Sequence, residues 1–504
     1  MVRINIVIRT THFVVQVLDP HLSHIIKTVC SNLVTYNFVY DKYKRKMIKQ
    51  KDKGYYTHVP HTNEYRFSIE NLRDFMLVLG TNQVKREEIQ VTHDRNYDIA
   101  TLGLRFNKEK YKLRKYQNKY SKLLISKDSS NIQLVDLRTG YGKTVIAMNA
   151  IVKLNYRLGI IVLPKYIDKW VGDIKDTTDI DDEDIYVVQG ADSLVELMEE
   201  EDMSYKIIIF SMRTVANYIK QYEETIFTYP VKPDELMQHL GIGTLLNDES
   251  HQEHHALFKA SLYFEVRKLI GLSATLVSNQ KDIDNMYKIL FPDKKRLSNL
   301  VKYDKYIYVK AINYRLELTR GIQYKRQQGY SHNLYEQSIM RNNVLLRSYI
   351  DMILYYVAES YISRRKKGEK LLIFAASVRL CTIIRNYVAN KYEDLDVRRY
   401  VEDDPYENLM EADICVATII GAGTAVDIPN LISVIQTISI SSLQANLQAV
   451  GRLRQLEGRD VWYYYLYTRD IGKQYKMHKD RRQAIQHTVK EYHNAEYHKT
   501  LKVK

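Results

Sequence analysis

Residues 136–144, Asp-Leu-Arg-Thr-Gly-Tyr-Gly-Lys-Thr, combine the residue types that hold nucleotide phosphates. They follow an apolar, strand-like run, 132–135, and precede a segment, 145–154, in which apolar residues recur at helical spacing. In such a turn, backbone N–H groups and the positive helix end face the anion, the lysine reaches the outer phosphates and the threonine ligates Mg²⁺. The residues expected around the phosphates are Leu137, Arg138, Thr139, Gly140, Tyr141, Gly142, Lys143 and Thr144.

Two further polar motifs follow apolar runs, as residues at the ends of parallel strands do. In the first, we expect Asp248 to hold Mg²⁺ through its water shell and Glu249 to polarise the water that attacks the γ-phosphate. His251 would then sense the nucleotide, and Ser273 and Thr275 of the second motif would couple hydrolysis to domain movement. Gly-Lys-Thr alone is common by chance, so the assignment of a nucleotide site depends on the presence of these two further motifs.

A transition-metal site is the alternative for the segment after Asp248, because His251, His254 and His255 are close by in sequence. Neither His-Glu-x-x-His nor its inverted form is present, and the histidines have no cysteine partners. We therefore expect no zinc here, and we expect His254 and His255 to lie on the surface of the following helix.

Residues 113–117, Leu-Arg-Lys-Tyr-Gln, stand some 25 residues before the glycine loop. A glutamine amide donates and accepts hydrogen bonds at once, so Gln117 could bind the edge of an adenine. The pentapeptide is weak evidence by itself, but its distance from the loop matches the adenine-binding motif of helicases.

In this order the motifs resemble those of superfamily 2 helicases and translocases, over about residues 110–470. That superfamily uses the shorter loop Thr-Gly-x-Gly-Lys-Thr, which accommodates Leu137 where the general pattern has glycine. The chain looks most like the UvsW-like branch-migration DNA helicases of tailed phages, which carry a small basic amino-terminal module and an Arg-Asn pair like Arg341-Asn342. The resemblance implies ATP and Mg²⁺ as cofactors, with Thr144 and Asp248 at the metal.

The resemblance also implies roles in the second half of the chain. Residues 448–454 are similar to the arginine-finger motif, in which a guanidinium stabilises transition-state charge and raises the rate roughly a thousandfold or more. Arg452 keeps the usual spacing from Gln448, whereas Arg454 stands one position early, and Ala425 replaces a family glycine before Asp427. The implied catalytic residues are Lys143, Asp248, Glu249, Arg452 and Arg454; further ATP contacts are Arg114, Gln117, Asp427 and Gln448; nucleic-acid contacts are Pro164, Lys165, Ser211, Ser377 and Thr418.

The net charge of +15 is concentrated at the two ends of the chain. Residues 1–120 hold 22 Lys and Arg against 11 Asp and Glu, and residues 471–504 hold 9 against 3. This pattern is typical either of a polyanion-binding surface or of a solvated basic surface. The 42 tyrosines favour nucleic acid, because aromatic rings stack on bases. Within the first region, Lys44, Arg45 and Lys46 lie in a basic run interleaved with tyrosines, around two polar-aromatic strands expected near 38–48 and 55–67.

Composition excludes several other classes of protein. A hydrophobic content of 45% with 27% charged residues is ordinary for a globular protein, and no apolar run reaches the roughly 20 residues of a membrane span. The first residues alternate like a strand and include charges, so they do not read as a signal peptide. Cys30, Cys381 and Cys415 are scattered, which favours a reducing cytoplasm. We expect a cytoplasmic monomer.

Apolar strands that alternate with helical patterns predict an α/β protein. We expect two tandem RecA-like domains, each a doubly wound parallel sheet, and a small amino-terminal α+β module. The expected segments are a basic module (1–105), domain 1 with the ATP site (106–295), a connector (296–340), domain 2 (341–470) and a basic helical tail (471–504). The expected partner is branched DNA; alternatives are RNA unwinding, duplex translocation without strand separation, and an ATP-binding clamp without turnover.

Overall fold

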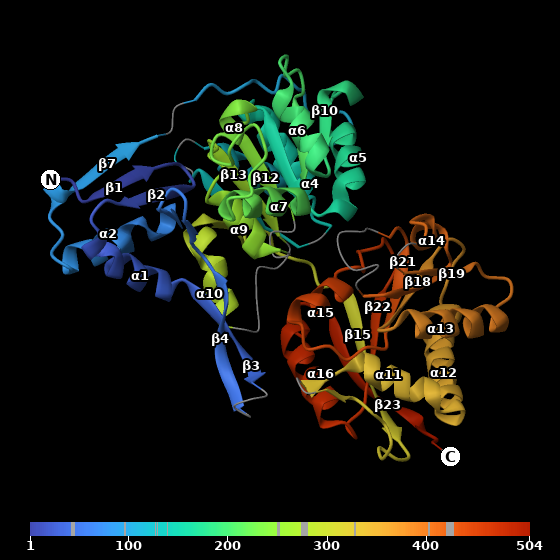
Figure 1. Ribbon diagram of the computed structural model, residues 1–504. Helices are drawn as coiled ribbons and strands as arrows, with labels where there is room; N and C mark the ends of the chain where they lie inside the picture. The colour runs from blue at the N-terminus through green and yellow to red at the C-terminus, as the bar shows by residue number, and fades with distance from the viewer. Residues whose placement is uncertain are drawn as a thin grey trace. The chain divides into compact units, whose positions relative to one another are not determined.

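The computed structural model divides into two compact units, Met1–Val301 and Lys302–Lys504 (Figure 1). Each unit is described by itself. The structure describes residues 1–41, 46–94, 97–126, 128, 130–138, 140–248, 253–273, 281–326, 329–401, 404–419 and 428–503.

The first unit begins with a five-stranded sheet in the order β5-β6-β2-β1-β7, in which only the β1–β7 pair is parallel. Ser68 caps the turn before the second helix, because its hydroxyl accepts a hydrogen bond from the Glu70 N–H. The elements are β1 Ile4–Ile8, β2 His12–Val17, α1 Ser23–Asn32, β5 Thr57–Val59, β6 Glu64–Ser68, α2 Leu72–Thr81 and β7 Ile89–His93.

A separate two-stranded hairpin consists of β3 (Val34–Asp41) and β4 (Lys46–Gly54). We call the hairpin the arm, and Figure 1 shows it extending away from the five-stranded sheet. The expected strands near 38–48 and 55–67 were therefore misplaced: the first is divided between β3 and β4, and the second between β5 and β6. Lys44 and Arg45 lie outside the described residues, whereas Lys46 is the exposed first residue of β4.

The amino-terminal sheet and the neighbouring parallel sheet share one hydrophobic core. The buried cluster includes Phe13 and Phe67 from the first sheet, whose ring centroids lie 5.3 Å apart, and Tyr218 and Phe258 from the second region. Burial of aromatic side chains on both sides stabilises the contact through the hydrophobic effect. The packing of the first unit is therefore continuous from the amino terminus into the ATP-binding region predicted from sequence.

Buried polar contacts join the same two parts. The Arg66 guanidinium is 2% exposed, lies 3.4 Å from the Asp234 carboxylate and stacks on the Tyr263 ring. The backbone N–H of Thr10 donates to both carboxylate oxygens of Glu265, at 2.9 and 3.0 Å. Removing one partner of such a buried pair leaves an uncompensated charge, so these contacts fix how the two sheets pack.

The rest of the first unit is a seven-stranded, wholly parallel sheet in the order β10-β11-β9-β12-β13-β8-β14. Its central strands are buried on both faces, as continuous apolar runs predict. The strands are β8 Ile132–Asp136, β9 Leu158–Val162, β10 Ile185–Val188, β11 Ile207–Ser211, β12 Thr244–Asn247, β13 Lys268–Ser273 and β14 Arg296–Leu297. The α-helices are α3 Lys115–Ile125, α4 Lys143–Leu154, α5 Ile167–Thr177, α6 Ala191–Glu199, α7 Met212–Glu223, α8 Leu236–His239, α9 His254–Ser261 and α10 Lys281–Leu290.

The second unit is also built on a seven-stranded parallel sheet, in the order β19-β20-β18-β21-β22-β15-β23. The strands are β15 Ile307–Leu316, β18 Lys370–Ala375, β19 Val397–Tyr400, β20 Ile414–Thr418, β21 Leu431–Gln436, β22 Val461–Tyr467 and β23 Glu491–Leu501. A small hairpin pairs β16 Lys325–Arg326 with β17 Gly329–Tyr330. The two parallel sheets confirm the predicted fold class.

The helices of the second unit are α11 His332–Arg341, α12 Asn343–Val357, α13 Val378–Lys391, α14 Glu407–Glu411, α15 Leu443–Val450 and α16 Gly472–Ile485. A π-helical turn, Ala358–Ile362, follows α12. Asn342 of the Arg-Asn pair caps α12, because its side-chain amide oxygen accepts hydrogen bonds from the N–H groups of Val344 and Leu345. Short 3₁₀ turns occupy Pro20–Leu22, Ile69–Asn71, Arg86–Glu88, Pro164–Tyr166, Asp182–Asp184 and Asp293–Lys295.

Two segments differ from expectation. The expected connector, 296–340, contains β15, which pairs with β22 on one side and β23 on the other. The expected helical tail, 471–504, is helical only in α16, and β23 then adds an edge strand to the sheet. Both strands mix tyrosine with charged residues, so their alternation is less visible in the sequence than a continuous apolar run.

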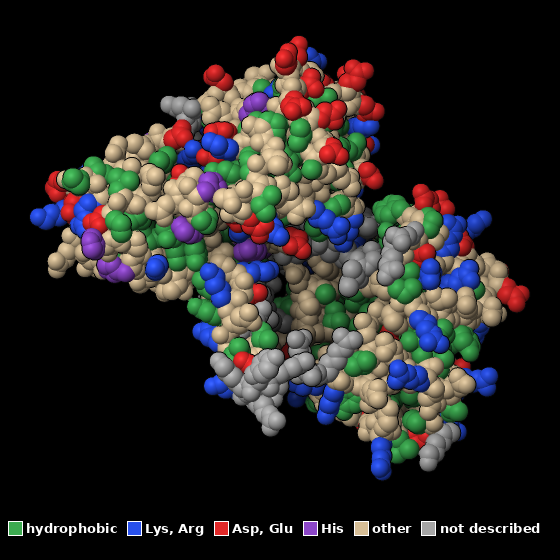
Figure 2. Space-filling model, in the orientation of Figure 1, with side chains coloured by type: hydrophobic (Ala, Val, Ile, Leu, Met, Phe, Trp, Pro, Cys, Tyr) green, Lys and Arg blue, Asp and Glu red, His purple; other side chains and the backbone are tan. Residues whose placement is uncertain are grey.

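Surface charge is uneven on the first unit. Figure 2 shows acidic side chains gathered over the part that holds α6 and β10. Exposed members of this group are Asp181, Asp182, Glu183, Glu199, Glu200, Glu201 and Asp202. Such a surface repels a polyanion. In the described parts of the chain, the helices are too short or too polar to cross a membrane.

Candidate functional site

The glycine loop connects β8 to α4, as the sequence predicts. Gly140 and Gly142 have φ values of +84° and +78°, a conformation that favours glycine. Gly142 immediately precedes α4, so the unpaired N–H groups of the first helical turn point towards the loop. The Lys143 ammonium donates to the Leu137 carbonyl at 3.3 Å and is therefore folded over the loop. This arrangement is a phosphate-binding geometry.

The adenine-binding candidate lies against the same loop. The Gln117 amide nitrogen donates to the Tyr141 carbonyl at 3.3 Å, and its oxygen accepts from the Arg114 N–H at 2.8 Å. A methyl group added at Gly142 would lie 2.4 Å from that amide nitrogen, so Gln117 and the loop are in close contact. The Arg114 guanidinium is exposed and donates to the Tyr116 hydroxyl.

Helix α5 connects the two residues predicted to lie at the metal. The indole N–H of Trp170 donates to the Asp248 carboxylate at 2.9 Å, and Trp170 itself is fully buried. One turn further along α5, the Asp173 carboxylate accepts from the Thr144 hydroxyl at 3.5 Å. Asp248 follows β12, which lies two strands from β8 in the sheet order. Thr144 and Asp248 are thus both positioned at the carboxyl edge of the sheet.

Ser273 is brought next to the loop. It ends β13, which pairs with β8, and its carbonyl accepts from the Leu137 N–H at 3.1 Å. Besides Lys44 and Arg45, the predicted site residues outside the described part of the chain are Thr139, Glu249, His251 and Thr275 in the first unit and Asp427 in the second.

The predicted nucleic-acid contacts of the first unit lie at neighbouring strand ends. Pro164 and Lys165 follow β9, and the Lys165 ammonium is 5.0 Å from the centre of the Tyr166 ring. Ser211 ends the adjacent strand β11 and is only 1% exposed. Lys165 is therefore more accessible to a nucleic-acid strand than Ser211, whose side chain is enclosed by the fold.

The corresponding residues of the second unit also lie on adjacent strands, since Thr418 ends β20 and Ser377 follows β18. A buried carboxylate occupies the Ser377 turn: Glu336 accepts from the N–H groups of Ala376 and Ser377 at 2.7 and 2.8 Å, and from the Ser377 hydroxyl at 2.7 Å. Burial raises the pKa of Glu336 to about 7, while the three donated hydrogen bonds act in the opposite direction. The donors of Ser377 are thus used within the fold.

The arginine-finger candidates follow α15. Gln448 lies within this helix, half-buried, and Arg452 comes two residues after its end with 3% of its surface exposed. The Arg454 guanidinium donates to the Gly451 carbonyl of the same turn. Lys143 therefore belongs to the first unit and both arginines belong to the second.

His254 is not a surface residue, so the expectation that it would lie on the surface is wrong, and His255 is half-buried. His254 is 5% exposed and lies edge-on to the Tyr287 ring, at 4.6 Å between centroids. The His255 Nε2–H donates to the Gly54 carbonyl at the base of the arm, at 2.8 Å. Burial lowers the pKa of His255, which favours the neutral donor form of the ring.

These groups fit a bound nucleotide and its metal. The loop offers helix N–H groups and an ammonium, which suit phosphate oxygens, and Thr144 with Asp248 supplies the hydroxyl and carboxylate oxygens that Mg²⁺ prefers. Three residues that contact predicted site residues were not assigned from sequence: Trp170 and Asp173 beside the glycine loop and Asp248, and Glu336 at the Ser377 turn of the second unit. Trp170 and Asp173 stand three residues apart on α5, a spacing that places them on one helical face. The sequence contains no comparable signal for Glu336.

Trp170→Phe tests whether the indole positions Asp248. The variant keeps a large apolar ring but removes a hydrogen bond to a charged group, worth about 1.5–3 kcal/mol. We expect kcat for ATP hydrolysis to fall about tenfold or more. Because Trp170 is fully buried and phenylalanine is smaller, the melting temperature falls as well, and circular dichroism verifies that the variant is folded at the assay temperature. Trp462→Phe is the matched control, since within the described structure the Trp462 indole N–H has no hydrogen-bond partner. Equal activities of the two variants would contradict a positioning role for Trp170.

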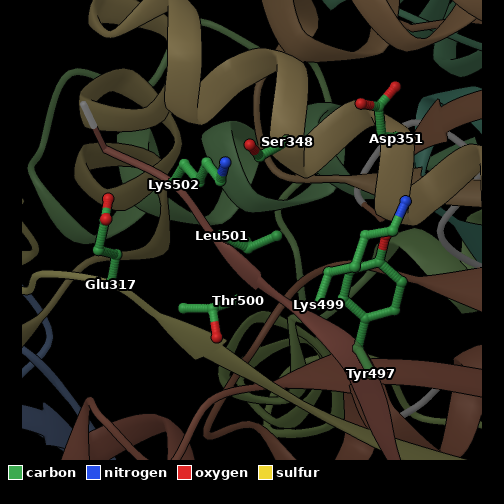
Figure 3. Close-up of a pocket in the computed structure, with 8 residues that line it drawn as sticks. All are labelled: Glu317, Ser348, Asp351, Tyr497, Lys499, Thr500, Leu501 and Lys502. Carbon is green, nitrogen blue, oxygen red and sulfur yellow. The ribbon is translucent and has the colours of Figure 1, made fainter.

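A pocket of about 480 Å³ lies elsewhere, on the second unit (Figure 3). It is lined by Glu317, Ser348, Asp351, Tyr497, Lys499, Thr500, Leu501 and Lys502. Its walls come from α12, from β23 with the residue that follows it, and from Glu317, which follows β15. None of the predicted nucleotide or nucleic-acid residues lines it.

Comparison with known protein families finds a match within the first unit. Residues 110–278 match the family model described as type III restriction enzyme, res subunit. That segment contains the glycine loop, Asp248 and Ser273. No curated protein matches the sequence.

Among solved structures, the chain is similar to a variant of S. cerevisiae Dbp5 bound to RNA and ADP BeF3, with a TM-score of 0.50 and 12% identity, over 76% of this chain and 90% of that one. A second structure, S. cerevisiae Dbp5 bound to RNA and ADP BeF3, has a TM-score of 0.49 and 11% identity over the same shares. The first likeness shows the fold, which is two RecA-like domains in tandem.

Proposed function

We propose that this chain, whose family match and tandem RecA-like fold support a superfamily 2 helicase, is an ATP-dependent DNA helicase or translocase acting on forks and junctions. One observation carries the proposal: the glycine loop presents Lys143 and Thr144 at the start of α4, and Asp248 is held at the end of a nearby strand of the same sheet. Branched DNA is favoured by the sequence resemblance to phage branch-migration helicases. Cytoplasmic location and a monomeric state belong to the same proposal.

In this function each residue of the first unit has a defined task. Lys143 binds the outer phosphates, which requires its ammonium to leave the Leu137 carbonyl. Thr144 and Asp248 orient Mg²⁺ and its water shell, and Trp170 keeps the Asp248 carboxylate in one orientation. Mg²⁺, when bound, offsets the phosphate charge. Glu249 orients and deprotonates the attacking water.

The second unit supplies the remaining groups. Arg452 contacts the γ-phosphate and stabilises the charge that spreads over it during transfer. Because Lys143 and Arg452 belong to different units, binding and release of the nucleotide alternately close and open the pair. Lys165 and Thr418 contact strand phosphates, which carry no sequence information, so movement proceeds regardless of sequence.

Comparison of nucleic-acid activators tests the proposal. ATPase turnover is measured with the full chain in the presence of forked DNA, four-way junctions, plain duplex, single-stranded DNA and RNA at equal nucleotide concentration. We expect forks and junctions to stimulate turnover most, because they present both a duplex and single strands. Stronger stimulation by RNA would overturn the DNA assignment, and stimulation by plain duplex alone would indicate translocation without strand separation.

A further inference from the structure

The arm presents two chemically different faces. Directly opposed residues of an antiparallel pair share a face, and successive residues alternate between faces. Tyr36 is opposite Lys51 and Phe38 is opposite Lys49, so these four side chains lie on one face. Val39, opposite Ile48, lies on the other. We call the first of these the Tyr36–Phe38 face.

The Tyr36–Phe38 face exposes aromatic rings beside ammonium groups. Phe38 is 67% exposed and Tyr36 is 36% exposed, and the Lys49 ammonium lies 4.0 Å from the centre of the Tyr36 ring. Met47, 56% exposed, is on the same strand and face as Lys49. Burial of a phenylalanine contributes about 1.5–3 kcal/mol, so leaving Phe38 in water forgoes a substantial gain that a partner could recover.

Among the described residues, the rest of the first unit holds the arm at its base and through Lys51, whose ammonium donates to the Tyr56 hydroxyl at 3.1 Å. The Thr35 hydroxyl donates to the Lys53 carbonyl at 3.3 Å, and the Gly54 carbonyl accepts from His255 on α9. Tyr55, the next residue, is 3% exposed and its ring lies 5.1 Å from that of Phe258. Beyond this base the arm is a two-stranded ribbon, which is only marginally stable by itself.

We propose that the Tyr36–Phe38 face binds single-stranded nucleic acid, with bases stacked on Phe38 and Tyr36 and the strand phosphates at Lys49 and Lys51. This proposal rests on the proposed function, in which a fork supplies single strands. Each stacked base contributes about 1–3 kcal/mol and every base offers a suitable ring, so the face binds without sequence preference. The described strands of the arm carry four lysines and two aspartates, a charge that complements a phosphate backbone.

Duplex fits this face less well than a single strand. A duplex presents phosphates outside and keeps its base faces stacked inside, so lysines alone would suffice to bind it. The Phe38 ring would then remain in water and would contribute no binding free energy. An unpaired strand presents base faces and phosphates together, which matches the two rings of β3 that lie beside the two ammonium groups of β4 on this face.

Phe38→Ala in the full chain tests the inference. Affinity is measured without nucleotide by fluorescence anisotropy, using labelled oligothymidine and oligouridine of about 20 nucleotides, so that DNA and RNA are distinguished, and a blunt DNA duplex of the same length. We expect affinity for the preferred strand to fall about fivefold or more, which corresponds to loss of about 1 kcal/mol of stacking. Lys49→Gln should weaken binding and make it less salt-dependent, because one phosphate contact is lost.

Val39→Ala is the matched control, since Val39 is 45% exposed on the same strand but on the opposite face. We expect it to bind both oligonucleotides like the unmodified chain. Equal affinities of Phe38→Ala and Val39→Ala would overturn the inference, as would an equal loss of affinity for blunt duplex. Both variants change exposed residues, and circular dichroism verifies their folding. The assay contains no ATP, so an inactive ATPase with a Phe38-dependent affinity would refute the proposed function and leave this inference standing.

Discussion

Lys143→Ala is expected to reduce nucleic-acid-stimulated ATP hydrolysis by at least about a hundredfold. The side chain is the cation of the glycine loop, and removal of one preorganised group that stabilises developing charge costs about a hundredfold to a thousandfold in kcat. The substitution removes only one hydrogen bond from the described structure, that to the Leu137 carbonyl. Turnover is measured by phosphate release under saturating ATP and forked DNA.

Lys153→Ala serves as the control for Lys143→Ala. It removes an ammonium from the same helix, where Lys153 donates to the Asn149 side chain at 2.8 Å, away from the loop. We expect it to retain most of the activity. Turnover by Lys143→Ala that matches this control would remove the basis for the motor function.

Arg452→Lys is expected to lower kcat by about a thousandfold, because an arginine at the γ-phosphate contributes at least that much in related phosphoryl-transfer sites. Lysine keeps the positive charge but cannot reproduce the planar, two-pronged donor geometry. Since the glycine loop lies in the other unit, binding of a fluorescent ATP analogue should persist. Single-turnover hydrolysis and equilibrium binding are measured on the same preparation.

Arg398→Lys is the corresponding control in the second unit. Arg398 lies on β19 and pairs with Asp396 and Glu411 at the surface, where ion pairs contribute little to stability. Arg454→Lys completes the comparison. Loss of turnover in Arg454→Lys but not in Arg452→Lys would show that the early arginine, despite its hydrogen bond to Gly451, is the finger.

The sequence predicts the parts of this fold in which one local pattern determines the structure. The central strands β9, β11 and β18 are short, continuous apolar runs, and such runs are typical of strands covered on both faces. The glycine loop is equally local, because Gly140 and Gly142 take positive φ values next to a helix start. Fold class and loop position therefore follow from sequence.

Features that depend on distant contacts could not be predicted in this way. Glu336 lies about 40 residues from the Ser377 turn that it holds, and nothing in its own neighbourhood marks it. Trp170 is 78 residues from Asp248. Strand β23 is a polar edge strand whose pairing with β15 spans most of the second unit. Such contacts become visible only when the chain is folded.

Two adjoining features determine how a mechanical load would travel. Among the described residues, the amino-terminal sheet and the parallel sheet share one buried core, so excising the first would expose apolar side chains and leave Glu265 without its Thr10 donor. The arm rests on α9, which begins six residues after Asp248. Tension on a strand gripped by the arm would therefore reach the helix beside the acidic motif through a hydrogen bond and packed rings. The stiffness of the arm would therefore determine how much of the force on the strand is transmitted to α9.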